Sequence, residues 1–216
     1  MKGEVFLELK GVSKHFGGVH ALQDVSFKLE KGKTLGLVGG NGSGKTTLLN
    51  VITKMVVPDK GKIVFKGEEI EKMPAYKISR LGVGRIFQTG GIFGNMTVLE
   101  NLLVAGKADR AQAETVLKEV DLEDKIDEKA ATLSGGQQRL LEFGRVMIRN
   151  DELILLDEPF AGVSEANSKK IEKVVKKLQE EGKTMVLIEH DSKRIKRLCD
   201  ELIELEKGKV VRRAKA

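Results

Sequence analysis

The sequence predicts an α/β protein that combines a mainly parallel sheet with an antiparallel β subdomain and an inserted α-helical subdomain. Three patterns support this fold class. Apolar strand patterns alternate with helical patterns after residue 34, which is typical of parallel strands joined by helical crossovers. Before that point apolar and polar residues alternate, as they do in half-buried antiparallel strands. The run over 98–150 is predominantly helical and interrupts the strand–helix rhythm.

The first half of the chain is expected to contain most of the strands. Half-buried strands are predicted over "EVFLELKGVSKHF" and "ALQDVSFKLEKGK", and a buried central strand over "TLGLVG". A helix is expected over "GKTTLLNVITKM", where apolar residues recur at helical spacing. A turn and an exposed edge strand follow in "VPDKGKIVFKGEEI", and then a short strand and a glycine-rich loop in "LGVGRIFQTGGIF".

The second half is expected to be mainly helical, with two more strands. The segments "TVLENLLVAG" and "AQAETVLKEVDL" have apolar residues at three- and four-residue intervals, which predicts helices. Two buried parallel strands, "DELILLDEP" and "KTMVLIEHD", flank the Lys/Glu-rich helix "SKKIEKVVKKLQEEGK". We therefore expect a single domain over 1–216, with the core and β subdomain in 1–97 and 151–216 and the helical subdomain in 98–150.

Composition limits the classes of function. The chain has 216 residues, of which 40% are apolar, and no apolar run approaches the ~18 residues needed to span a membrane. Its single cysteine, Cys199, cannot form an internal disulfide and is expected to be a packing residue. The net charge is +6, but lysines alternate with glutamates along the predicted helix, as on a solvated face. No nucleic-acid partner is therefore expected.

A phosphate-binding loop is the strongest motif. "GGNGSGKT" matches G-x-x-x-x-G-K-[ST] and lies between an apolar strand and a helix, where that motif must lie. Its backbone N–H groups and the helix N-terminus suit a β-phosphate, while the lysine reaches the β- and γ-phosphates and the threonine hydroxyl ligates Mg²⁺. The predicted nucleotide-binding residues here are Gly39, Gly40, Asn41, Gly42, Ser43, Gly44, Lys45, Thr46 and Thr47, with Thr46 as a metal ligand.

Two carboxylates and a histidine follow buried strands. Asp157 and Glu158 end "LILLDEP", and His190 ends "VLIEHD". Ligands bind at the carboxyl ends of parallel strands, so all three should emerge at the site. Asp157 is the expected partner of Mg²⁺, and Glu158 is the candidate base for the attacking water. His190 could orient that water, although an ordinary polar strand end would look the same.

A second phosphate-binding pattern, "TLSGGQQRLLEFGR", raises the question of why one chain would have two. The phosphate loop, "LSGGQQ" and the strand before His190 together resemble the ATP-binding subunits of ABC transporters, over nearly the whole chain. The resemblance implies a P-loop NTPase (RecA-like) core and two subunits stacked head to tail around two ATP molecules. It implies that Ser134, Gly135 and Gly136 cap the γ-phosphate of ATP bound to the partner subunit, with Gln137 close by as a further nucleotide-binding residue.

Other positions match the family one at a time. Phe16 is placed as the aromatic that stacks on adenine, although a core phenylalanine would show the same pattern. Gln88 resembles the glutamine that touches Mg²⁺ and senses the membrane subunit. Phe93 and Met96 lie where a permease docks, or simply pack a short loop. Ser164 departs from the usual aspartate of the loop that helps to join the two subunits, which puts cooperative hydrolysis in doubt.

The resemblance implies an ATPase that drives a separate permease, using ATP and Mg²⁺ as cofactors, with a second ABC ATPase subunit as its partner. It also implies a cytoplasmic protein, peripheral on the inner face of the cell membrane. The segments "FGGVHAL" and "GQQRLLEFGR" are most similar to ATPases of branched-chain amino-acid importers, which use an external substrate-binding protein. "LLDEPFAGV" also resembles the ATPase of lipopolysaccharide export, so the cargo stays open. The alternative is a non-transport ABC ATPase acting in DNA repair, translation or cofactor assembly.

Overall fold

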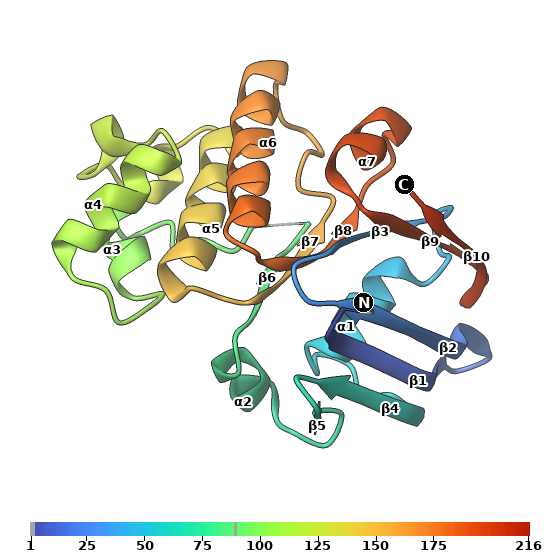
Figure 1. Ribbon diagram of the computed structural model, residues 1–216. Coiled ribbons are helices and arrows are strands. Elements are labelled where there is room, and N and C mark those ends of the chain that lie inside the picture. Colours follow the sequence, from blue (N-terminus) through green and yellow to red (C-terminus); the bar gives the residue numbers. More distant parts are fainter. Residues whose placement is uncertain (1–2, 89) are drawn as a thin grey trace.

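The computed structural model describes residues 3–88 and 90–216, and its larger sheet positions the candidate site. The strand order is β10-β9-β3-β8-β7-β6 (Figure 1). Neighbouring strands pair in parallel from β9 to β6, and only the pair β10–β9 is antiparallel. The mainly parallel sheet is therefore confirmed. Its strands are β3 (Thr34–Val38), β6 (Val83–Ile86), β7 (Leu153–Asp157), β8 (Thr184–Ile188), β9 (Glu201–Glu206) and β10 (Lys209–Lys215).

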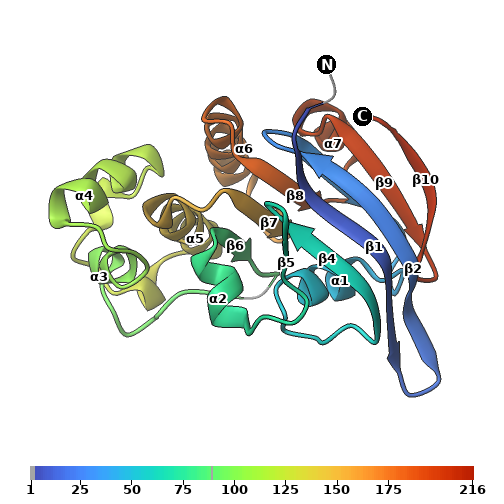
Figure 2. The same cartoon turned by 60° about the horizontal axis from the view of Figure 1, so that its bottom comes forward.

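The smaller sheet is antiparallel throughout and lies beside α1, as Figure 2 shows. Its order is β2-β1-β4-β5, with strands β1 (Val5–Phe16), β2 (Val19–Glu30), β4 (Lys60–Phe65) and β5 (Glu68–Glu69). The prediction that β4 is an exposed edge strand was wrong. It pairs with β1 on one side and with the short β5 on the other, and its Ile63 and Phe65 are fully buried.

Helices surround the larger sheet and also form a separate lobe. The helices α3, α4 and α5 pack on one another in this lobe, at the left of Figure 1. The predicted first helix is shorter than expected, because α1 ends at Ile52 and Lys54 already has a positive φ of 59°. The helices are α1 (Lys45–Ile52), α2 (Ala75–Arg80), α3 (Val98–Leu103), α4 (Arg110–Glu119), α5 (Gly135–Arg149), α6 (Glu165–Glu180) and α7 (Ser192–Leu198). Two short 3-10 turns, Glu123–Lys125 and Ala130–Thr132, precede α5.

The central strands divide the apolar core into two clusters. All residues of β7 and β8 are buried, as their continuous apolar sequences predict. Because successive side chains of a strand point to opposite faces, Leu155 packs with α1 and the smaller sheet, while Leu156 packs with α5 and α6. Both faces of the sheet are thus covered, and polar groups emerge at the strand ends. Among the described residues, no helix is both long and apolar enough to cross a membrane.

Candidate functional site

The loop between β3 and α1 takes a backbone path that requires glycine at two points. Gly39 has φ 145°, and a Cβ there would lie 2.2 Å from the carbonyl oxygen of Leu205. Gly44 has φ 106°, and a Cβ there would lie 2.4 Å from the carbonyl oxygen of Ala21. Residues with a side chain rarely adopt such φ values. The loop is therefore held close to the neighbouring backbone at both points.

Two polar side chains of this loop are placed to receive an anion. Lys45 is 6% exposed, and its Nζ donates to the carbonyl oxygens of Gly39 at 2.8 Å and Gly40 at 2.9 Å. Burial lowers the pKa of Lys45, while the nearby Glu158 and Asp157 raise it. The buried Ser43 Oγ has no hydrogen-bond partner among the described residues. An unpaired hydroxyl and a lysine that bonds only to its own loop fit a phosphate group.

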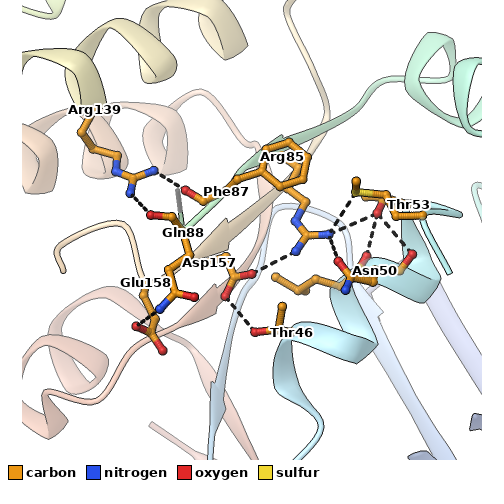
Figure 3. A network of polar contacts seen from close by, with 11 residues as sticks. Thr46, Asn50, Thr53, Arg85, Phe87, Gln88, Arg139, Asp157 and Glu158 are labelled. Carbon is orange, nitrogen blue, oxygen red and sulfur yellow. Dashed lines mark hydrogen bonds and ion pairs between the residues drawn. The ribbon is translucent and has the colours of Figure 1, made fainter. Parts of the chain in front are cut away.

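Asp157, the last residue of β7, lies under this loop with its side chain 2% exposed. Its Oδ1 accepts from Thr46 Oγ1 at 3.4 Å, and its Oδ2 accepts from Arg85 Nη2 at 2.9 Å (Figure 3). The oxygen atoms of Thr46 and Asp157 face each other across a short gap, and hard cations such as Mg²⁺ prefer oxygen ligands. The donor set is therefore suitable for this ion.

Glu158 is held by side chains from the two neighbouring strands. Its Oε2 accepts from Gln88 Nε2 at 3.0 Å, and its Oε1 lies 2.9 Å from His190 Nε2. Gln88 and His190 each lie two residues beyond the end of a strand, β6 and β8, which flank β7 in the sheet. The structure thus brings Glu158 and His190, which the sequence analysis placed at this edge, together with Gln88, which it assigned through the family resemblance. Glu158 itself has a left-handed backbone, with φ 50°, a conformation that in a residue with a side chain costs energy and concentrates at functional sites.

These groups line one open hollow. The phosphate loop from Asn41 to Thr47 forms one wall, Val19 and Ala21 of β2 form another, and the three side chains around Glu158 form the third. Phe16 does not line the hollow. It lies at the end of β1, is 48% exposed, and has Lys14 Nζ 5.3 Å from its ring centre. Its role toward adenine stays a prediction.

The segment Ser134–Gln137, which we call the signature segment, lies at the start of α5 and does not line this hollow. Ser134 Oγ accepts from the Gln137 N–H at 3.3 Å, and Gln137 Oε1 accepts from the Ser134 N–H at 2.9 Å. This reciprocal pair is a capping box, which satisfies two N–H groups at the helix start. Ser134 and Gly135 are exposed, whereas a Cβ on the buried Gly136 would lie 2.2 Å from Asn167 Nδ2.

Sequence reasoning missed three charged residues behind the site. Arg85 pairs with Asp157, as described above. Arg139 of α5 donates to the carbonyl oxygens of Phe87 and, at 2.9 Å, Gln88, and pairs with Glu142 at 2.6 Å. The only clue in the sequence was a charge inside an otherwise apolar strand or helix face.

The remaining expectations for individual residues concern loops around the site. Ser164 accepts from the Asn167 N–H at 3.4 Å and caps α6, so here it serves as an N-cap. Phe93 is 48% exposed with the guanidinium of Arg145 4.7 Å from its ring centre, and Met96 is half-buried. Cys199 packs against the second apolar cluster, and burial raises the pKa of its thiol to about 12. That agrees with a packing role.

Comparisons with known proteins agree with this geometry. A family model described as ABC transporter matches residues 22–161. The high-affinity branched-chain amino acid transport ATP-binding protein BraF of Pseudomonas aeruginosa is 35% identical over 225 residues, covering 94% of this chain and 88% of BraF. The probable branched-chain amino acid transport ATP-binding protein LivG of Archaeoglobus fulgidus is 34% identical, covering 97% of this chain and 89% of that protein.

Solved structures are similar over nearly the whole chain. A nucleotide-free ATP-binding cassette from an ABC transporter superposes with a TM-score of 0.90 at 31% identity, covering 98% of this chain and 92% of the other. A dimeric ATP-binding cassette in a post-hydrolysis state, bound to ADP and Pi, gives a TM-score of 0.87 at 28% identity, covering 97% and 98%. The likeness therefore extends to both the hollow and the signature segment.

Proposed function

The chain belongs to the ABC transporter family as an ATP-binding and ATP-hydrolysing subunit, and we propose that it drives a separate permease in the membrane. The observation that carries the proposal is Glu158, whose two carboxylate oxygens are engaged by Gln88 and His190 beside the phosphate loop. A carboxylate oriented next to a γ-phosphate is what ATP hydrolysis requires of a general base.

The proposed reaction uses groups that line the hollow, together with the buried Asp157 behind Thr46. Lys45 and the loop N–H groups bind the β- and γ-phosphates, and Thr46, Asp157 and Gln88 hold Mg²⁺. When bound, Mg²⁺ offsets the negative charge on the phosphate oxygens. The water oxygen attacks the γ-phosphorus while Glu158 accepts a proton from that water. The bond to the β–γ bridging oxygen then breaks and releases ADP and phosphate, with His190 orienting the reacting groups.

The signature segment supports a head-to-tail dimer. Ser134 and Gly135 are exposed at a helix N-terminus and lie outside the hollow around Lys45, so they are free to contact ATP bound to another subunit. We propose that ATP binding closes two such subunits, of this chain or of a related one, and that hydrolysis separates them. Closure and separation would then move the permease.

A cavity of about 300 Å³ beside α2, β6 and α5 supports a docking site for the permease. Its walls include Met55, Ile78, Phe87 and Arg145, and the exposed Phe93 lies against Arg145. Docked to a permease in this way, this chain would be peripheral on the inner face of the membrane. The names of BraF and LivG refer to branched-chain amino acid transport, which favours an amino-acid cargo over lipopolysaccharide. We propose import, with an external substrate-binding protein as a further partner.

The test is capture of the partner. The chain, expressed at its native level, is pulled down from detergent-solubilised membranes and its partners are identified by mass spectrometry. We expect a protein with several membrane-spanning segments, and we expect less of it with Phe93→Glu than with the wild type. Val211→Glu, which adds the same charge at an exposed apolar residue of β10 away from this cavity, is the control. Recovery of soluble partners alone would favour a non-transport ATPase.

A further inference from the structure

Arg85 is a buried cation that connects β6 to both elements of the nucleotide site. Its side chain is 5% exposed and pairs with Asp157 Oδ2 at 2.9 Å. The other end of the guanidinium, Nη1, donates to Asn50 Oδ1 at 2.6 Å and Thr53 Oγ1 at 3.3 Å, both on the α1 side (Figure 3). The ring of Phe87 covers it, with its centre 4.7 Å from Cζ. One planar group thus joins the end of β7 to the helix that begins at Lys45.

This arrangement fixes how the Asp157 carboxylate is rotated. The carboxylate has two oxygens, and the two contacts are divided between them, with Oδ2 on Arg85 and Oδ1 on Thr46. The bond to Arg85 is the shorter of the two, and a charge-assisted bond is also the stronger kind. Without Arg85, a carboxylate that is 2% exposed would lose its cation and be free to rotate. Oδ1 would then no longer be held toward Thr46.

We propose that Arg85 is the positioning residue of the metal site: it holds Asp157 so that Oδ1 and Thr46 Oγ1 together face the metal of a bound metal–nucleotide complex. The inference rests on the proposed use of Mg²⁺ by Thr46 and Asp157. Arg85 touches neither nucleotide nor metal and acts through Asp157. It is anchored by Asn50 and Thr53, so the spacing between α1 and β7 is set by the same side chain.

The test separates the effect of the metal from the effect of the fold. The affinity for a fluorescent non-hydrolysable ATP analogue is measured with excess Mg²⁺ and again with a chelator, by equilibrium titration. Arg85→Met keeps the length and apolar contacts of the side chain but removes the bond to Asp157. We expect its affinity without metal to stay within about twofold of the wild type. With Mg²⁺ we expect it to bind at least tenfold more weakly, because Asp157 Oδ1 is no longer held beside Thr46 toward the metal.

Arg149→Met provides the matched control. Arg149 also pairs with a buried aspartate, Asp151, through bonds of 3.1 to 3.3 Å, but neither residue lines the nucleotide hollow. Its loss should lower the melting temperature and leave both affinities unchanged. Arg85→Lys, which keeps the charge but cannot reach Asp157 and Asn50 with one planar fork, should recover part of the effect of Mg²⁺. It also covers the case in which Arg85→Met does not fold.

The outcomes separate this inference from the function it rests on. If the wild type binds the analogue and Mg²⁺ tightens binding, but Arg85→Met and Arg85→Lys show the same tightening, the inference is overturned and the ATPase site stands. Equal weakening with and without metal also overturns it, because Arg85 would then support only the fold. If Mg²⁺ has no effect on the wild type, the assignment of Thr46 and Asp157 fails, and the inference fails with it.

Discussion

The phosphate hollow and the signature segment differ in how far their functional side chains are held in place by other parts of this chain. Around the hollow, Asp157 is 1% exposed, and its bonds run to α1 and β6. In the signature segment, the side chains of Ser134 and Gln137 bond only to each other's backbone. Since a buried carboxylate requires partners, Asp157 of the first region is positioned within this chain, without a second subunit. The signature segment is a capped helix N-terminus that is exposed to solvent.

Replacing the base should produce the largest effect, and it tests the hollow alone. Glu158→Gln keeps a group that can bond to Gln88 and His190 but cannot accept the proton of water at neutral pH. We expect phosphate release at least ~100-fold slower, the scale of lost general-base catalysis. Nucleotide binding should persist, and light scattering after size exclusion should show an ATP-dependent dimer. Glu180→Gln, at a carboxylate exposed at the other end of α6, should change neither property. Unchanged turnover of Glu158→Gln would remove the role assigned to Glu158.

A change in the signature segment should affect the dimer and spare the hollow. In the Glu158→Gln background, Ser134→Arg places bulk where the γ-phosphate of the partner's ATP is proposed to lie. We expect the ATP-dependent dimer to be lost, so that at least a tenfold higher ATP concentration is needed to form any dimer. Affinity of the monomer for nucleotide should stay unchanged, because Ser134 does not line the hollow. The cap is also lost, at a cost of about 1 kcal/mol of stability, so a thermal scan must show that the variant is folded.

Ala111→Arg adds the same charge to an exposed position of α4 in the same lobe and serves as the control. The dimer should survive there. A dimer that persists in Ser134→Arg would contradict the head-to-tail arrangement and leave the signature segment without a function. A monomer that also loses nucleotide affinity would mean that the two regions are not separate, contrary to the comparison above.

The hollow could be predicted from the sequence because short segments of the chain determine most of its geometry. A glycine-rich loop between an apolar strand and a helix can adopt one kind of path, and carboxyl ends of parallel strands meet at one edge. Glu158 and His190 therefore lie together as expected, whereas Gln88 was assigned through the family resemblance. Arg85 was missed because its partner is 72 residues away, and a lone arginine in "VGRI" does not indicate which buried charge it meets. The helix α2 and the hairpin of β9 and β10 were also not foreseen, since short elements depend on tertiary packing.

The two regions are joined by a buried ion pair. We expect a change in this pair to have the smallest effect of those predicted here, a small change in the stability of the fold. Arg139 and Glu142 of α5 bond to each other, and they also hold the backbone at Phe87, Gln88 and Gly91, the last through a bond of 2.5 Å to Glu142 Oε1. A movement of Gln88 would thus be transmitted to the helix that carries the signature segment. Burial raises the pKa of Glu142 even though Arg139 and the Gly91 N–H lower it.

Because the folded state holds this proton more tightly than the unfolded chain, Glu142 destabilises the fold increasingly as pH rises from the ordinary value of 4.5 to the raised pKa. Glu142→Gln keeps an oxygen for Gly91 and has no such titration. We expect its stability in urea to differ from the wild type by about 1 kcal/mol or less, and to improve relative to the wild type across that pH window. Glu165→Gln, at an exposed carboxylate of α6, should show the same dependence of stability on pH as the wild type. If the free energy of unfolding depends on pH in the same way for the wild type and Glu142→Gln, Arg139 fully compensates the buried charge. Ionisation of Glu142 would then not destabilise the contact between the two regions.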